Sequence, residues 1–253
     1  RPVANPDSPE RYMLTSNAPT PTTAGQTPVT TIAAMSWFSE FGQNQVGFIP
    51  WSISGQVHRV FPLFDKYHVL ITRGSDATGY RTTLESFQPD TYLDGSIPNA
   101  GSLTSGGQLS HLPAGEVTIW SDRQSQTRTL NGAGNLTEAP TLVGGHVGLA
   151  YSWYADPWPR ELIESPRHGM IKARIIRAGV SVRNMISLKF RRNSTVTEIP
   201  AYGPEDDPNQ SPPLKTERYR FSVFGNRTHP DLQVFEDVPN TVEITELIQE
   251  VQG

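Results

Sequence analysis

Short runs of alternating apolar and polar residues recur along the chain. Two of them lie close together, at residues 53–61 and 67–73. The positions that share the inward face are Ile53, Gly55, Val57, Arg59 and Phe61 in the first run and Tyr67, Val69 and Ile71 in the second. Period-2 patterning with β-branched and aromatic residues predicts half-buried strands. Pro62 and Asp65-Lys66 suit the connection between them.

The same patterning predicts further strands along the chain. They lie at residues 80–87, 116–120, 141–154, 169–177, 184–192 and 218–224. Polar, glycine-containing tracts separate several of them, above all 94–110 and 121–138, and predict long surface loops. Two segments instead predict helix. One is a short turn within Thr30–Trp37, and the other is an amphipathic helix over Thr241–Val251.

The N-terminal segment differs from the rest of the chain. Its prolines, in a background rich in Ser, Thr and Asn, are Pro2, Pro6, Pro9, Pro19, Pro21 and Pro28. They exclude a helix interior or a central strand and predict either a disordered tail or an arm that orders against neighbouring subunits. We therefore expect an arm at 1–31, one β domain at 32–225 and a C-terminal extension at 226–253.

Composition favours an all-β protein. The 253 residues include 21 glycines and 22 prolines, and only 18% are charged, so turn-formers are frequent between short apolar runs. There is no cysteine, which excludes disulfides and thiolate chemistry. No apolar run approaches the roughly 18 residues of a membrane span. The net charge of −4 does not indicate a nucleic-acid polycation.

Catalytic and metal-binding patterns are missing from the sequence. The histidines show no HxH or HxxxH spacing, which a metal site usually has. Glu205-Asp206-Asp207 lies among prolines and predicts a solvated loop rather than a calcium site. No GxSxG, P-loop or dinucleotide fingerprint occurs. We expect no enzyme and no cofactor, unless the fold brings together carboxylates or histidines that are distant in the sequence.

One segment is locally basic. Between Arg160 and Arg192, lysines and arginines far outnumber the two glutamates. Such a surplus can contact RNA phosphates, because each neutralised phosphate releases counterions. We expect these charges rather to pair with acidic loops of neighbouring chains or to solvate a sheet face. The candidate contact residues are Lys172, Arg174, Arg177, Lys189, Arg191 and Arg192.

Two short motifs rich in aromatic residues and proline are specific enough to compare with known families. The first is Phe48-Ile-Pro-Trp-Ser-Ile-Ser-Gly-Gln-Val-His-Arg59, an aromatic-Pro segment followed by a small residue, a glycine and a basic strand. The second is Tyr151-Ser-Trp-Tyr-Ala-Asp-Pro-Trp-Pro-Arg160, an aromatic pair followed by a Pro-aromatic-Arg loop. Both resemble elements of the capsid proteins of picorna-like (Picornavirales) RNA viruses, although the arginine that usually precedes the glycine in that family is Ser54 here.

The resemblance implies a fold and a role. The fold is an eight-stranded antiparallel jelly-roll β-sandwich with long loops, an extended N-terminal arm and a C-terminal extension. The role is a structural capsid subunit. It assembles with companion capsid proteins and copies of itself into an icosahedral shell around a single-stranded RNA genome, in the host cytoplasm and then in the virion. The Asp-Asp-Phe tripeptide of some insect-virus capsid proteins is missing, so no catalytic residue is carried over.

Two questions stay open at this level. Residues 184–192 match the last jelly-roll strand, yet the chain continues to Gly253, so Arg218–Phe224 is the alternative last strand. The alternative function is a β-sandwich carbohydrate-binding or adhesin module. Its stacking surface would consist of Trp51, Trp120, Trp153 and Trp158, although most of these lie on predicted strands, where core packing is their ordinary role.

Overall fold

The computed structural model describes two compact units of the chain. The described residues are 3–4, 13–16, 29–40, 43–64, 66–76, 79–87, 92–99, 103–155, 174–192, 194–222 and 232–252. The backbone, but not the side chain, is described at 3–4, 13–16, 33–40, 43–51, 75, 174–175, 247–249 and 251–252. Unit 1 comprises Arg1–Ser121 with Gln126–Leu149, and unit 2 comprises Asp122–Ser125 with Ala150–Gly253.

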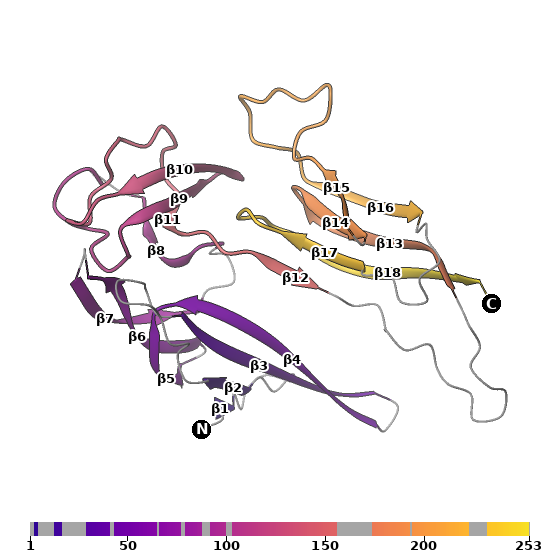
Figure 1. Ribbon diagram of the computed structural model, residues 1–253, viewed down its shortest axis with the longest axis horizontal. Helices are drawn as coiled ribbons and strands as arrows, with labels where there is room; N and C mark the ends of the chain where they lie inside the picture. Colours follow the sequence, from indigo (N-terminus) through magenta and orange to yellow (C-terminus); the bar gives the residue numbers. More distant parts are fainter. Residues whose placement is uncertain are drawn as a thin grey trace. The chain divides into compact units, whose positions relative to one another are not determined.

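Unit 1 contains three antiparallel sheets (Figure 1). The first has the order β1-β2-β3-β4, with β1 (Val3–Ala4), β2 (Met13–Ser16), β3 (Val29–Glu40) and β4 (Gln43–Ser54). The second is the meander β5 (Gln56–Leu63), β6 (Lys66–Ser75) and β7 (Gly79–Ser86). The third has the order β10-β9-β11-β8, with β8 (Asp94–Pro98), β9 (Gly115–Ser121), β10 (Gln124–Leu130) and β11 (His146–Leu149).

Unit 2 contains two antiparallel sheets. One has the order β12-β17-β14-β15, with β12 (Trp153–Ala155), β14 (Leu188–Arg192), β15 (Thr195–Ile199) and β17 (Leu232–Glu236). The other has the order β16-β13-β18, with β13 (Arg174–Met185), β16 (Lys215–Ser222) and β18 (Glu243–Gln252). The predicted all-β class is confirmed for the described residues. None of these residues forms a helix long and apolar enough to cross a membrane.

The two sheets of unit 2 pack face to face. Their core contains Ala178, Val180 and Val182 from β13, Leu188 and Phe190 from β14, Ile199 from β15, and Leu232 and Val234 from β17. The rings of Phe190 and Phe221 stack at 4.0 Å between centroids and thereby join β14 to β16. Each fully buried side chain of this size contributes roughly 1.5–3 kcal/mol to folding. The apolar face that alternation predicts for residues 184–192 therefore packs in the core between the two sheets.

A β-bulge corrects the predicted face of the first strand run. Ile53, Gly55 and Val57 are buried as predicted, but the pairing of β5 with β6 shifts register after Val57. Two successive residues then face outward, so Val60 is buried in place of the predicted Arg59 and Phe61. The list of buried residues in this cluster is Ile32, Ile53, Val57, Val60, Val69 and Ile71. In the second run, Val69 and Ile71 are buried and Tyr67 packs against them.

The predicted helical turn at Thr30–Trp37 is wrong, because this segment lies in β3. Val29, Thr30 and Ile32 are β-branched residues that favour strands. The buried Thr30 hydroxyl also donates a hydrogen bond to the carbonyl of Gly55 at 2.7 Å and accepts one from the amide of Val57 at 3.1 Å. These contacts hold the start of β3 against the junction of β4 and β5.

The predicted helix at Thr241–Val251 is also wrong, because Glu243–Gln252 forms β18. The apolar positions match a helical face, and adjacent Leu247 and Ile248 interrupt a strand alternation, but the segment pairs with β13 from Arg174 to Arg183. Strand pairing on an existing sheet outweighs the weak local preference for helix. Glu243, Glu246 and Glu250 then meet arginines of this sheet, which a solitary helix would not provide.

Strands pair across both boundaries of the predicted division into 1–31, 32–225 and 226–253. β3 begins inside the predicted arm and pairs with β4, while β17 and β18 lie in the predicted extension and pair with β14 and β13. The division itself stays a prediction. The pairings mean that the last residues of the chain are part of the sandwich of unit 2.

Gly55 provides the first test of this fold. Its φ is 137°, and a Cβ atom added there would lie 2.8 Å from both the carbonyl oxygen of Thr72 and Cδ1 of Ile71. We expect Gly55→Ala to lower the free energy of unfolding by about 3 kcal/mol, from backbone strain and overpacking together. Gly79→Ala is the matched control, because Gly79 has a φ of 75° but open space around the added Cβ. Equal losses in urea denaturation would contradict the proposed steric contact.

Candidate functional site

The six basic candidate residues do not form one patch. Lys172 lies outside the described residues, and Arg174 begins β13 with only its backbone described. The side chains of Arg177, Lys189, Arg191 and Arg192 are described, and they all belong to unit 2. Each of these four contacts an acceptor within the same chain.

Lys189, on β14, forms ion pairs with two carboxylates at the end of β17. Its Nζ contacts the carboxylate of Asp237 and lies 3.5 Å from Oε1 of Glu236. Partial burial by itself lowers the pKa of Lys189, but the hydrogen bond to Asp237 and the two carboxylate charges outweigh it and raise that pKa. The hydrogen bond from Lys189 lowers the pKa of Asp237 against the opposing effect of partial burial. The pair therefore holds both groups in their charged forms.

Arg191 and Arg192 also bind neighbouring strands. Nη1 of Arg191 donates to Oε1 of Gln233 at 2.7 Å, and its guanidinium lies 4.5 Å from the centre of the Phe235 ring. This is a cation–π contact between β14 and β17. Nη1 of Arg192 donates to the carbonyl of Ser222. Both arginines thus contribute to the packing of the strands that surround β14.

Arg177 lies on the other sheet, where charges balance across three strands. Its Nη1 is 3.2 Å from Oε2 of Glu250 on β18. In the same sheet Nη2 of Arg218 on β16 lies 2.5 Å from Oε2 of Glu246. The Arg218 hydrogen bond is the main cause that lowers the pKa of Glu246. Exposed pairs of this kind contribute little to stability, but they leave this sheet face with compensated charges.

The two groups of cations lie on opposite faces of unit 2. Phe190 points into the core between the sheets, so Lys189 and Arg191, its neighbours on β14, point outward from that sheet. Ala178 points into the core from β13, so Arg177 points outward from the opposite sheet. A single RNA strand lying on one face would therefore not meet all of them.

A buried polar cluster in unit 2 was not predicted from the sequence. The Glu236 side chain is 1% exposed. Its Oε2 accepts a hydrogen bond from the Ser187 hydroxyl at 2.8 Å, and its Oε1 accepts one from the amide of Asp237 at 3.0 Å. Nδ2 of Asn240 donates to the carbonyl of Ser187 at 2.5 Å. The cluster connects the loop before β14 to the end of β17, so its chemistry is structural.

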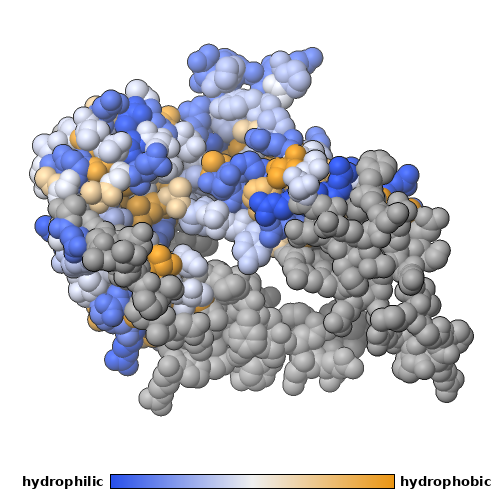
Figure 2. Space-filling model, viewed as in Figure 1, coloured by the Kyte–Doolittle hydropathy of each residue, from blue (hydrophilic) through white to orange (hydrophobic). Residues whose placement is uncertain are grey.

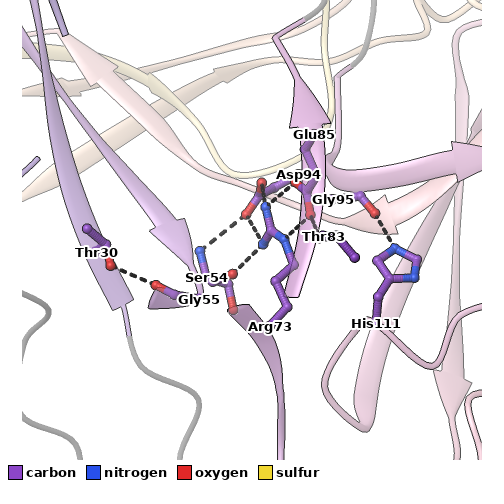
Figure 3. A network of polar contacts seen from close by, with 9 residues as sticks. All are labelled: Thr30, Ser54, Gly55, Arg73, Thr83, Glu85, Asp94, Gly95 and His111. Carbon is purple, nitrogen blue, oxygen red and sulfur yellow. Dashed lines mark hydrogen bonds and ion pairs between the residues drawn. The ribbon is translucent and has the colours of Figure 1, made fainter. Parts of the chain in front are cut away.

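A second unpredicted cluster surrounds Arg73 in unit 1 (Figure 3). The Arg73 side chain is 1% exposed and lies between Glu85 on β7 and Asp94 on β8. Its Nε and Nη2 donate to the two oxygens of Glu85 at 2.7 and 2.8 Å. Its Nη2 and Nη1 donate to the two oxygens of Asp94 at 2.5 and 2.9 Å, and Nη1 also contacts the carbonyl of Ser54. All five donors of the guanidinium face acceptors.

The charge of buried Arg73 is compensated by the carboxylates of Glu85 and Asp94. Burial by itself lowers the pKa of Arg73, but the hydrogen bonds and charges of Glu85 and Asp94 outweigh burial and raise that pKa above its ordinary value. Gly95, at a φ of 61°, keeps the site narrow, since a Cβ there would lie 3.1 Å from the guanidinium carbon. The site links β4, β6, β7 and β8, and the guanidinium donors are bound by acceptors of unit 1.

Two of the described histidines, His58 and His111, contact neighbouring groups of unit 1. Nε2 of His58 shares a hydrogen bond of 2.7 Å with the Thr72 hydroxyl, and Nε2 of His111 contacts the carbonyl of Gly95 at 2.9 Å. His168 and His229 lie outside the described residues. Within the described ranges, no three His, Cys, Asp or Glu side chains are placed to hold a metal ion.

The acidic loop 205–207 uses its carboxylates to fold on itself. Oδ2 of Asp206 accepts from the amide of Gly203 at 2.5 Å, and Oδ1 of Asp207 accepts from the amide of Asn209 at 2.9 Å. The hydrogen bonds from Asn209 lower the pKa of Asp207. The bond to Asn209 is an Asx-type turn, and the bond from Gly203 closes the loop from the other side.

The tryptophans with described side chains are not a stacking platform. Trp120 is 9% exposed and makes an edge contact with Tyr92 at 5.4 Å between ring centroids. Trp153 packs against the core cluster of unit 2. The side chains of Trp51 and Trp158 are outside the described part of the chain.

The alternation of inward and outward positions along a strand indicates that Arg73 and Glu236, the centres of the two clusters, are buried. Arg73 continues the inward set of Val69 and Ile71, and Glu236 continues the inward set of Leu232 and Val234. Charged residues at inward positions of a strand imply a buried partner. Glu85 and Ser187 lie on predicted strands, but two further members, Asp94 and Asn240, come from segments that have no strand pattern, so the sequence alone does not identify the full clusters.

The Arg73 cluster predicts a large effect of a single truncation. Arg73→Ala would leave two carboxylates uncompensated, and we expect a loss of about 3–5 kcal/mol in the free energy of unfolding. Arg81→Ala is the matched control, because exposed Arg81 pairs directly with Arg73 across β6 and β7, and we expect a change below about 1 kcal/mol. Similar changes for both variants in urea denaturation would refute the buried network.

The Lys189–Asp237 pair predicts a pH dependence. Because folding lowers the pKa of Asp237, its stabilisation is present above the ordinary carboxyl value of about 3.9 and is lost as pH falls through the lower folded value. We expect the urea midpoint of the wild type to fall more steeply than that of Asp237→Asn between about pH 5 and pH 2. Parallel curves would show that the pair does not act in solution.

Comparison with known proteins does not assign this chain to a family. No family model matches the chain, and no curated protein matches it. Its function is therefore argued from its own residues and motifs.

Proposed function

We propose that this chain is a structural capsid subunit of a small icosahedral, picorna-like RNA virus. It assembles with companion capsid proteins and with copies of itself into a shell around single-stranded RNA. The observation that carries the proposal is the motif 48–59, because the glycine of that motif is a residue on which unit 1 depends.

Gly55 occupies the junction at which the motif changes from its aromatic-Pro half to its basic half. The aromatic-Pro half runs along β4 and the basic half along β5. At the junction Gly55 has a φ of 137°. A Cβ atom added to Gly55 would lie 2.8 Å from the carbonyl oxygen of Thr72. A glycine is required there by conformation and by space. The glycine that the motif shares with the family is therefore also required by the fold. A match by chance would not be expected to fall on such a position.

The second motif supports the same proposal. Within Tyr151–Arg160, residues Trp153–Ala155 form β12, which pairs with β17 at one side of a sheet in unit 2. Trp153 packs on the core and Tyr154 is 67% exposed, so the aromatic pair divides between the two faces of the sheet. The Pro-aromatic-Arg part of the motif lies beyond the described residues.

The proposed fold is an eight-stranded jelly roll with long loops. It requires antiparallel sheets that pack face to face on alternating side chains, and the two sheets of unit 2 have this arrangement. Its function is assembly: the sheets give rigidity, and the loops and the N-terminal arm give contacts between subunits. No catalytic step is needed for this role, and we propose that the chain is not an enzyme.

We assign the described basic residues to the structure of the subunit rather than to RNA binding. Lys189 already has two carboxylates, Arg177 has Glu250, and Arg191 has Gln233 and Phe235. A cation that already has an acidic partner gains less from a phosphate, because its charge is compensated before RNA arrives. The carbohydrate-binding alternative has no comparable support, since Trp120 is buried and Trp153 packs on the core.

Two deletions of the N-terminal arm test the proposal. Removing residues 1–28 deletes β1 and β2 but keeps β3 paired with β4, and it keeps Thr30, whose hydroxyl bridges Gly55 and Val57. We expect this variant to fold but to form no closed shell with its companion chains, because the arm supplies contacts between subunits. Removing residues 1–31 also deletes the Thr30 bridge and should cost a further 1–3 kcal/mol or so in stability.

Assembly is measured by sedimentation velocity, and folding by urea denaturation of both deletion variants. Closed shells formed by a chain that lacks residues 1–28 would defeat the role of the arm. Equal stability of the two variants would contradict the Thr30 bridge.

A further inference from the structure

The tip of the hairpin between β5 and β6 presents an unusually exposed aromatic residue. The Phe64 side chain is 91% exposed, and its neighbour Leu63 is 41% exposed. Hydrophilic residues cover most of the described surface in Figure 2, and hydrophobic residues lie among them as separate spots. Single exposed apolar residues are common on protein surfaces, so exposure alone does not give Phe64 a function.

The backbone of Phe64 supplies a second, independent observation. Leu63 pairs with Lys66 across the hairpin, which leaves a two-residue loop. Such loops require positive φ and strongly favour Asn, Asp or Gly. Phe64 has a φ of 57°, although a bulky residue in this region is a clear outlier. The turn therefore holds an unfavourable residue, and Phe64 is not there to stabilise the hairpin.

At other described positions with positive φ, residues that tolerate this conformation occur. Among the described residues other than glycine, Asp122, Arg123 and Asn184 also have positive φ values. Asp122 opens the two-residue turn between β9 and β10, and its carboxylate accepts a hydrogen bond from the Ser211 hydroxyl. Asn184 is a residue type that tolerates this conformation. Only at Phe64 does an exposed, apolar aromatic side chain occupy such a position in this part of the structure.

We propose that Phe64, supported by Leu63, is an anchor that inserts into an apolar pocket of a neighbouring protein subunit. The inference rests on the proposed role of the chain in assembly and names one contact that assembly uses. The hairpin of β5 and β6 presents the ring at its tip, and an aromatic side chain that fills a pocket is the typical centre of a protein interface. Exposed Lys66, next to the turn, suits the polar rim of such a contact.

A protein pocket fits this tip better than a lipid surface. Burying Phe64 and Leu63 in a bilayer would remove less apolar area from water than one acyl chain does, and a single acyl chain binds membranes only marginally. The hairpin lacks the cluster of basic residues that would strengthen attachment to anionic lipids, since Lys66 is the one lysine or arginine of the segment 60–69. A shaped pocket can bind two side chains specifically, because the hairpin loses little conformational freedom on binding.

The test combines a gain in folding with a loss in assembly. Phe64→Asn places a preferred residue in the turn, so we expect the urea midpoint to rise or stay equal while the yield of particles falls at least about tenfold. Val143→Asn is the matched control, because Val143 is 89% exposed in unit 1 but lies outside the hairpin. We expect particle yields equal to wild type for this control.

Each outcome decides between the alternatives. Unchanged yield for Phe64→Asn, or an equal loss for Val143→Asn, would overturn the anchor while leaving the capsid proposal intact. A wild type that forms no particle with its companion chains would overturn the capsid proposal and the anchor with it. As a second measurement, benzoylphenylalanine at position 64 should crosslink, on irradiation of particles, to apolar residues of another protein chain. Crosslinks to added anionic phospholipid vesicles alone, or none at all, would refute the pocket.

Discussion

A buried guanidinium is the constraint around which unit 1 is arranged. Arg73 leaves water almost completely, and its burial is tolerable only because Glu85 and Asp94 together occupy its donors. Such a network is weak evidence for net stability, since apolar residues of similar volume often do as well. What it does impose is geometry: β6, β7, β8 and the end of β4 have to meet at one point. The narrow space at Gly95 and the bridge from Thr30 to Gly55 belong to the same arrangement.

The sequence predicts strands well where one face of a strand is apolar. The inward positions of Val69, Ile71 and Phe190 follow from alternation alone, and they are buried. It predicts poorly where tertiary pairing decides. β18 has apolar spacing compatible with a helix, and only its pairing with β13 makes it a strand. β10 carries alternating polar side chains at the side of a sheet, and polarity alone predicts a loop there.

The candidate site divides along the same line. Composition and alternation located a basic segment, but not what its cations contact, because Glu250, Asp237 and Gln233 lie far along the chain. These partners show that Arg177, Lys189 and Arg191 bind other strands of unit 2. We infer that assembly uses exposed contacts, above all the strained and apolar tip at Phe64.

We propose that this chain works as one of many subunits in a closed shell. Sedimentation velocity of the material from its native source, followed by mass spectrometry of the sedimenting fraction, tests this claim most directly. The account predicts one large, homogeneous particle that contains this chain together with companion chains and RNA. A monodisperse monomer of 28.0 kDa from the same source would contradict it.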